Sequence, residues 1–348
     1  MAAVRHRPWV GNTAPGQGYL CGCRWQWHVA LIVVLVSSGL VSAEASAAES
    51  ARPFLIGALT ESWGPTPQMV GLRDGLLGVG YRENERFVIG VRFTQGNLAA
   101  LLTSAHELVQ DGVDLIFVSE ESPAKAAQMA TTRIPIVFAA VGDPLGLGLI
   151  QSFARPGGNI TGVTNLDLDL SPKRLEVFRE IIPGLRRVLY PYDASDAYSL
   201  AVSRAYREAA GRMGIELVER AFQSQEEARA FLTQVQKGDI DGIIKPKSLS
   251  LNIPGFILEA TSQRAIPSMF DGAFWVEQGA LASYAPDFYE SGRQAARLVD
   301  KILKGVDPRE IPVEVNPKIE FVINLKVAKA LGLTIAPEIL YRADRLVR

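Results

Sequence analysis

The feature that most constrains the fold of this chain is a regular alternation of short apolar runs with helical patterns. The run at 134–141, for example, is apolar throughout, which suits a strand that helices cover on both faces. Strands are predicted at 54–59, 87–93, 114–119, 134–141, 160–163, 187–193, 215–222, 241–246, 266–271 and 280–285, and helices at 67–77, 98–110, 123–130, 172–182, 199–213, 225–236 and 256–263. This alternation predicts an α/β fold of Rossmann-like lobes with parallel sheets and right-handed crossovers.

The alternation pauses at Asn165–Ser171 and then restarts, which indicates two similar α/β lobes without a residue-level repeat. The end of the chain follows another pattern. A helix is predicted at 288–303, an interrupted extended stretch at 314–325 and a helix at 326–331. This tail is too short for a third domain, so it must pack back onto both lobes and make each of them discontinuous.

The composition is that of a globular protein with room for two domains. The 348 residues are 48% hydrophobic and 21% charged, and 36 basic residues face 37 acidic ones. Because the formal net charge is -1 and no basic stripe is present, nucleic acid and anionic membrane surfaces are not expected as partners.

The first 47 residues have the pattern of a signal peptide and leader. Arg24 precedes the apolar run Val29–Ala43, and small residues follow it, with cleavage expected after Ala43 or Ala47. The alternative is an uncleaved anchor, but the run is shorter than the roughly 20 residues that a spanning helix needs. Both cysteines fall in this leader, so the mature protein is expected to contain no thiol. We therefore predict export to the periplasm.

The remaining sequence lacks the usual signatures of catalysis and of cofactor binding. His106 is the only histidine after the leader, and it lies in a predicted helix where a solvated position is expected. A serine-histidine-acid triad, a histidine-rich metal site and G-x-S-x-G are therefore excluded. The segment Gly75–Gly80 follows a helix and is interpreted as a helix stop, and no G-x-G-x-x-G or P-loop occurs. No enzyme activity, metal or cofactor is expected.

Polar and aromatic residues gather where the predicted strands end. Helix N-termini that begin there offer free N–H groups to a carboxylate or another anion, and aromatic rings offer apolar contact. For each polar residue the alternative is an ordinary cap or turn, and Lys245 could pair with a ligand carboxylate or with a neighbouring side chain. The candidate ligand contacts are Glu61, Ser62, Trp63, Ser119, Glu121, Ser122, Asp143, Tyr192, Asp193, Lys245, Ser248, Asp271, Phe274 and Trp275.

Four segments carry a family resemblance: Gly142–Asn165 (GDPLGLGLIQSFARPGGNITGVTN), Ser171–Val188, Tyr289–Gly305 and Phe321–Leu340. Through them the chain resembles the ABC transporter substrate-binding proteins of the type I periplasmic-binding fold, in the family related to tryptophan- and tyrosine-binding proteins. The resemblance covers nearly all of Pro53–Asp344.

The resemblance implies two α/β lobes that three hinge crossings join and that close around a small molecule. The crossings are expected near 165–170, 285–287 and 312–316. The N-terminal lobe is expected to comprise 53–166 and 287–314, and the C-terminal lobe 167–286 and 315–348. Such a protein presents its ligand to the membrane permease of an ABC transporter, touches the membrane only through that permease and is expected to be a monomer.

Several residues depart from the pattern that is common among relatives, notably Glu120-Glu121, Lys245-Pro246-Lys247 and Phe274-Trp275. We therefore expect a small organic acid or amino acid with an aromatic or apolar body. Lys245 and helix N-termini are the expected anion contacts. The expected walls are Trp63, Tyr192, Phe274 and Trp275. The alternatives are an exported sensory module that delivers its ligand to a receptor, and an exported α/β enzyme.

Overall fold

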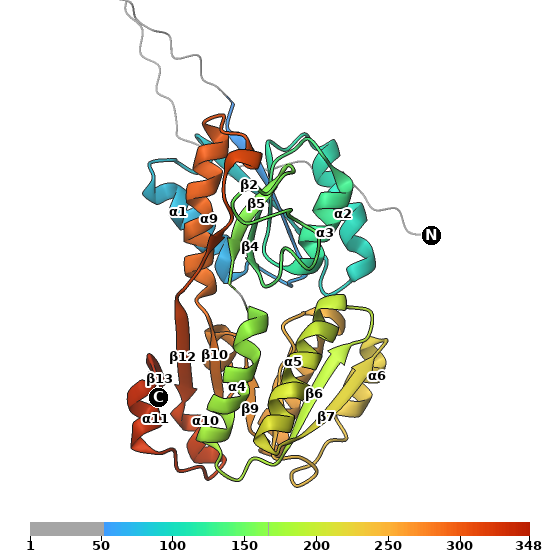
Figure 1. Ribbon diagram of the computed structural model, residues 1–348, viewed down its shortest axis with the longest axis vertical. Helices are drawn as coiled ribbons and strands as arrows, with labels where there is room; N and C mark the ends of the chain where they lie inside the picture. The colour runs from blue at the N-terminus through green and yellow to red at the C-terminus, as the bar shows by residue number, and fades with distance from the viewer. Residues whose placement is uncertain (1–51, 166) are drawn as a thin grey trace, which may run out of the picture. The chain divides into compact units, whose positions relative to one another are not determined.

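The computed structural model describes residues 52–165 and 167–348, and these form two α/β lobes, each built on its own sheet (Figure 1). The predicted leader and its cleavage positions lie outside the described residues. Across 52–165 and 167–348, none of the helices is long and apolar enough to cross a membrane.

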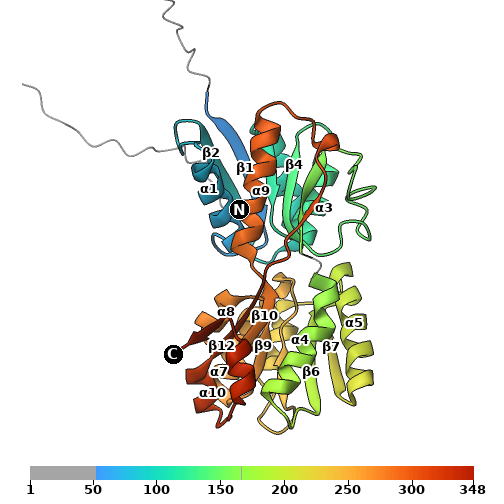
Figure 2. The same cartoon turned by 60° about the vertical axis from the view of Figure 1, so that its left-hand side comes forward.

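The first lobe contains a six-stranded sheet in the order β11-β5-β4-β3-β1-β2, and every neighbouring pair is parallel. The apolar side chains of α1 and α9 pack on one face of this sheet and those of α2 and α3 on the other. Figure 2 shows α1 and α9 on one side of the sheet and α3 on the other. The strands are β1 (Phe54–Thr60), β2 (Phe87–Phe93), β3 (Leu115–Val118), β4 (Ile136–Val141), β5 (Ile160–Thr164) and β11 (Glu314–Val315). The helices are α1 (Pro67–Gly78), η1 (Leu98–Ala100), α2 (Leu101–Gln110), α3 (Glu121–Ala130), α9 (Phe288–Leu303) and η3 (Pro308–Glu310).

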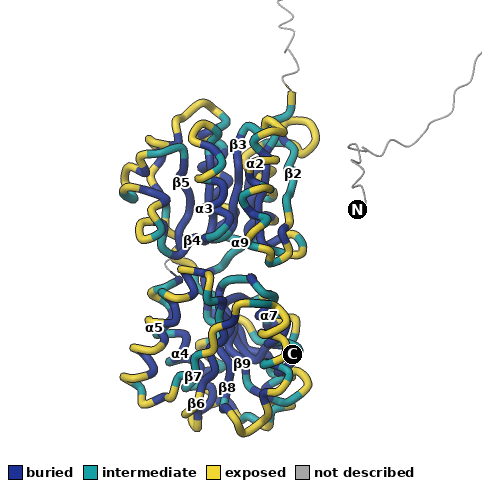
Figure 3. Tube along the Cα trace, turned by 90° about the vertical axis from the view of Figure 1, so that its right-hand side faces the viewer, coloured by how far each residue is buried: buried dark blue, intermediate teal, exposed yellow. Residues whose placement is uncertain are grey.

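The second lobe contains a seven-stranded sheet in the order β13-β12-β10-β9-β8-β6-β7, in which only β10 and β12 pair antiparallel among the described strands. Figure 3 shows the buried strands at the centre of both lobes. The strands are β6 (Arg187–Asp193), β7 (Glu216–Phe222), β8 (Gly242–Ile244), β9 (Ser268–Phe270), β10 (Ala282–Pro286), β12 (Ile319–Asn324) and β13 (Arg345–Val347). The helices are α4 (Asp167–Ile181), α5 (Ala197–Met213), α6 (Gln225–Leu232), η2 (Ser250–Asn252), α7 (Ile253–Arg264), α8 (Ala273–Glu277), α10 (Leu325–Ala330) and α11 (Pro337–Arg342).

The chain passes between the two sheets three times: between β5 and α4, between β10 and α9, and between β11 and β12. The returning tail therefore supplies α9 and β11 to the first lobe and β12 and β13 to the second, so both lobes are discontinuous. This arrangement follows from the short tail, because α9 buries its apolar face against α1 while β12 adds a strand to the other sheet.

Two sequence-based helix boundaries are wrong by four residues or more. Helix α4 begins at Asp167 and not at Pro172, because the Asn165 side-chain oxygen accepts a hydrogen bond from the Asp167 N–H at 3.2 Å and stabilises the first turn. Helix α1 ends at Gly78, one residue beyond its predicted end. Helix α6 ends at Leu232, four residues before the predicted end.

Glycines allow α1 and α9 to approach each other closely. A Cβ atom on Gly71 would lie 2.0 Å from the carbonyl oxygen of Tyr289, and one on Gly292 would lie 2.0 Å from that of Gln68. One on Gly75 would lie 2.5 Å from the Cβ of Ala296. The helix does end within the segment Gly75–Gly80, as predicted, but Gly75 itself serves helix packing, and a single sequence cannot distinguish these two roles of a glycine.

A buried arginine fixes the start of α4 to the second lobe. The Arg174 guanidinium lies 2.6 Å from the Asp167 carboxylate and donates hydrogen bonds to the Tyr206 hydroxyl at 2.9 Å and to the Tyr284 carbonyl at 2.8 Å. Burial alone would raise the pKa of Asp167, but the neighbouring Arg174 charge outweighs it, so the pKa lies below its usual range. The ion pair holds the helix segment that directly follows the first crossing.

Candidate functional site

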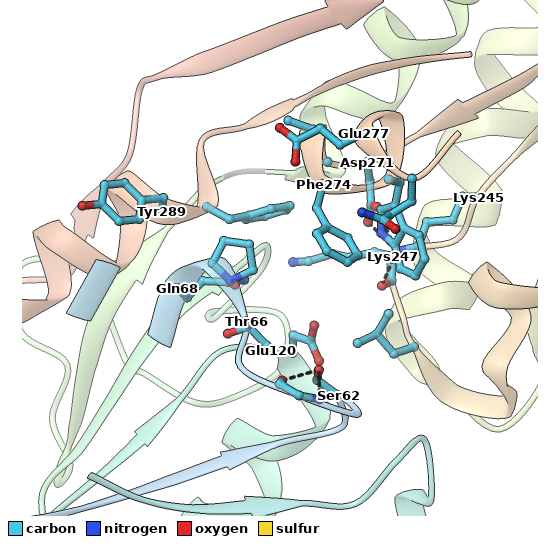
Figure 4. A pocket seen from close by; sticks show the side chains of 18 of the residues that line it. Ser62, Thr66, Gln68, Glu120, Lys245, Lys247, Asp271, Phe274, Glu277 and Tyr289 are labelled. Carbon is cyan, nitrogen blue, oxygen red and sulfur yellow. Dashed lines mark hydrogen bonds and ion pairs between the residues drawn. The ribbon is translucent and has the colours of Figure 1, made fainter. Parts of the chain in front are cut away.

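A pocket of about 680 Å³ lies where the two lobes face each other, and both lobes contribute to its walls (Figure 4). The first lobe supplies the loop after β1 and the start of α1, at 62–68, together with Glu120 after β3. The second supplies side chains after β8 and the segment 271–275 after β9. The crossing segment 286–289 closes one side. In parallel α/β sheets the carboxyl ends of strands form such sites because successive loops meet there.

Six of the residues predicted from strand ends line this pocket: Ser62, Trp63, Lys245, Asp271, Phe274 and Trp275. Trp63 and Phe274 are 46% and 51% exposed, so their rings are accessible to a ligand in the pocket. Trp275 packs edge-on against Phe274, with ring centroids 5.3 Å apart. Figure 4 shows Phe274 projecting into the cavity.

Four predicted contacts do not line the pocket because they complete turns or pack in the second lobe's core. Asp143 accepts a hydrogen bond from the Gly146 N–H at 2.8 Å, and Asp193 accepts one from the Ser195 N–H at 2.7 Å. The Ser248 hydroxyl donates to the Ser250 hydroxyl at 2.8 Å. Tyr192 stacks on Tyr190 with ring centroids 5.8 Å apart.

The other four predicted contacts, Glu61, Ser119, Glu121 and Ser122, lie behind the pocket wall of the first lobe and are not among its lining residues. Glu61, Ser119 and Glu121 are buried, and Ser122 is partly buried. They surround Glu120, which does line the pocket. Their position after the strands was predicted, but Glu121 and Ser122 already belong to the first turn of α3, and after β1 it is Ser62 and not Glu61 that lines the pocket.

Lys245 is held by an internal ion pair. Its Nζ lies 2.8 Å from an Asp271 carboxylate oxygen and donates a hydrogen bond to the Lys247 carbonyl at 2.9 Å, with the lysine side chain 2% exposed. The sequence left two roles open for Lys245, pairing with a ligand carboxylate or with a neighbouring side chain. In the structure Lys245 pairs with a neighbouring side chain, that of Asp271. Burial raises the pKa of Asp271, partly offset by Lys245 and Arg174.

Lys247 reaches from the second lobe into the first. Its Nζ lies 2.5 Å from Glu121 and donates a hydrogen bond to the Ala140 carbonyl at 2.7 Å. Ala140 has a φ of 65° at a register shift in β4, a conformation that favours glycine. Burial alone would lower the pKa of Lys247, but Glu121 and Asp167 outweigh it and raise the pKa. A strained backbone residue and a buried ion pair thus meet across the two lobes.

Two further carboxyl groups have strongly shifted pKa values. Burial, together with the charge of Glu121, raises the pKa of Glu120 to about 7 against the opposing effect of Lys245 and Lys247. Burial and then the charge of Glu120 raise the pKa of Glu61 well above its usual range. Both carboxyl groups therefore keep their protons to a higher pH than an exposed glutamate does.

Sequence reasoning missed several lining residues. Gln68 lies in the first turn of α1 and Arg345 in the last strand, where no sequence signal separates them from ordinary surface positions. Glu320 also lines the pocket and accepts a hydrogen bond from Arg345 at 3.2 Å. Helix α8, which carries Phe274 and Trp275, was not predicted because one helical turn has no detectable periodicity.

Comparison with known proteins gives a consistent family assignment. A curated relative, the tyrosine-binding protein of Clostridioides difficile (strain R20291), is 28% identical over 265 residues, which are 76% of this chain and 76% of the relative. A conserved domain protein of Vibrio cholerae has a similar crystal structure, with a TM-score of 0.77 and 27% identity over 85% of this chain and all of that one.

A second crystal structure, an ABC domain from Streptococcus pneumonia in complex with L-Trp, has a TM-score of 0.76 and 26% identity, and the match covers 85% of this chain and 100% of that one. The two-lobed fold is that of the type I periplasmic-binding proteins. The sequence profile described as ABC transporter substrate binding protein matches residues 63–347. This chain therefore belongs to the family of ABC transporter substrate-binding proteins, which capture ligands for ABC transport.

Proposed function

We propose that this protein captures a small amino acid or organic acid that has an aromatic or apolar body, and that it presents this ligand to an ABC permease. The observation that carries the proposal is the pocket, because both lobes line it and exposed aromatic rings face it. A ligand that touches both walls stabilises their approach, since a conformational equilibrium shifts toward the state that the ligand binds better. The permease can then distinguish the closed, ligand-bound protein from the open, empty protein.

The proposal includes the predicted lobes, 53–166 with 287–314 and 167–286 with 315–348, as the units that move. It also includes export through a cleaved leader to the periplasm, a monomeric state and the absence of catalysis. Trp63, Phe274 and Trp275 are the proposed apolar ligand contacts, because they line the pocket and carry large ring surfaces.

Native mass spectrometry of the purified protein tests ligand capture directly, because a ligand enclosed between two lobes is expected to co-purify. Fluorescence titration with amino acids and aromatic acids complements it. Trp63 and Trp275 are the only tryptophans after residue 50, and both line the pocket. Binding is expected to change the emission, and Trp275→Phe is expected to remove most of that change. A protein that neither co-purifies with a small molecule nor responds to any of them contradicts the proposal.

A further inference from the structure

Every cation that lines the pocket is already paired with a carboxylate among the described residues. Lys245 is paired with Asp271 at 2.8 Å and Lys247 with Glu121 at 2.5 Å. Arg345 is paired with both Glu277 and Glu320. An anionic ligand group would therefore have to compete with an existing internal ion pair for each of these charges.

One lining carboxylate has no such partner. Within 52–165 and 167–348, Glu120 forms no ion pair, and its buried Oε2 accepts no hydrogen bond. The charges that act on it do not cancel its own, because Glu61, Glu121 and Asp271 surround it together with only two lysines. The wall around Glu120 is therefore negative when its carboxylates are ionised, and it attracts a positive group.

A second observation on the same wall points to a ligand that donates hydrogen bonds. Gln68 lines the pocket and is 5% exposed, and its Oε1 is buried without a hydrogen-bond donor among the described residues. Figure 4 shows Gln68 and Glu120 on the same side of the cavity, opposite Asp271 and Phe274. Buried acceptors in proteins are normally satisfied, so two unsatisfied acceptor oxygens on one wall call for donors from outside the chain.

The opposite wall suits the body of such a ligand. Phe274 and Trp275 present ring faces and edges there, and Trp63 adds an exposed ring from the first lobe. Aromatic rings bind apolar bodies and also favour a nearby ammonium group through the negative ring face. The first lobe's wall therefore offers the unsatisfied acceptors together with Trp63, and the second lobe's wall offers the rings of Phe274 and Trp275.

From this division we propose that the pocket selects ligands by an ammonium group, which binds to Glu120 and Gln68 while an aromatic or apolar body packs on Phe274 and Trp275. The inference rests on the proposed function and refines it: the positive group is essential, and a carboxylate on the ligand is dispensable. Aromatic amines and amino acids fit this site, and simple organic acids do not.

The test compares three probes that share one ring system: L-tryptophan, tryptamine and indole-3-propionate. Titration calorimetry is expected to detect L-tryptophan and tryptamine and to give at least tenfold weaker binding of indole-3-propionate. Binding of the acid at least as tightly as the amine overturns the inference. The inference is also overturned if none of the three probes binds and none of the matching tyrosine compounds binds, namely L-tyrosine, tyramine and 3-(4-hydroxyphenyl)propionate. The proposed function itself fails only if, in addition, no small molecule co-purifies with the protein.

The variant Glu120→Gln keeps the shape of the side chain and removes its charge. Tryptamine is expected to bind this variant at least tenfold more weakly, with a cooperative thermal unfolding curve as proof of folding. Glu107→Gln serves as the control, because Glu107 pairs with Arg92 on the surface of α2 away from the pocket. Unchanged tryptamine affinity in a folded Glu120→Gln protein contradicts the assignment of the ammonium site.

Discussion

The Nζ atom of Lys247 lies 2.5 Å from the carboxylate of Glu121, and this buried ion pair joins the segment after β8 in one lobe to the first turn of α3 in the other. The two side chains are 5% and 8% exposed. Because the pair joins the two lobes directly, the chain itself contributes to holding the two pocket walls together.

Replacing Lys247 by Met is expected to favour separation of the lobes. The variant leaves Glu121 without its cation in the joined arrangement, whereas water can solvate it when the lobes part. Ligand affinity is expected to fall about tenfold or more, since the binding-competent fraction falls. Small-angle scattering of the ligand-free protein is expected to give a larger radius of gyration. Lys304→Met, which removes a surface ion pair with Asp300, is the control. It is expected to change neither the ligand affinity nor the radius of gyration.

Arg174→Met is expected to destabilise the second lobe by about 3–5 kcal/mol in urea unfolding, because it leaves the buried Asp167 carboxylate unpaired. Lys173→Met in the same helix removes a half-exposed pair with Glu176 and is expected to change much less. Equal midpoints for the two variants contradict this account of α4. Since the pKa of Asp167 is lowered, the stabilisation is present above its unfolded pKa and is lost as the pH falls through the folded value.

Gly71→Ala is expected to cost about 3 kcal/mol or more, because the new Cβ would lie 2.0 Å from a backbone oxygen of α9 that cannot move aside alone. Gly78→Ala at the end of the same helix meets nothing within 4 Å. It is expected to be neutral or to stabilise by up to about 1 kcal/mol, because alanine is the better helix former. Thermal unfolding of the pair decides whether close helix packing is the reason for Gly71.

Glu120 is expected to make stability depend on pH between 4.5 and 7. Its pKa rises from 4.5 to about 7 on folding, so the folded protein retains the proton more tightly. Stability from this group is therefore complete below pH 4.5 and is lost as the pH rises through 7, by about 3 kcal/mol. Urea unfolding of Glu120→Gln across this range is expected to show a flatter profile than the unchanged protein. Parallel profiles would mean that the pKa of Glu120 is not shifted.

Amine binding is expected to strengthen as the pH rises through about 7, because Glu120 then loses its proton and attracts an ammonium group. The groups that act on Glu120 are Glu61, Glu121, Lys245, Lys247 and Asp271. Tryptamine titrations at pH 5.5 and 8 are expected to differ by about tenfold or more, a factor that corresponds to about 1.4 kcal/mol. In Glu120→Gln the difference is expected to shrink, and an undiminished difference would assign the effect to another group.

The sequence alone determined the alternation of strands and helices, the two lobes and the return of the tail to both. These depend on local periodicity, which the chain carries wherever it folds. Helix α8 was not predicted because it is a single turn. The packing role of Gly75 was not predicted because one sequence does not distinguish a glycine at a helix end from a glycine at a helix contact.

The tertiary structure decided which of the strand-end residues act together. Lys245 meets Asp271 from 26 positions away, and Lys247 meets Glu121 from 126 positions away. No local pattern encodes such distances, and the same lysine at a strand end could have faced a ligand. Whether Glu120 is free and Lys245 is paired depends on how two separate sheets bring their loops together, because the energy of a buried charge depends on every neighbour in space and not on its neighbours in sequence.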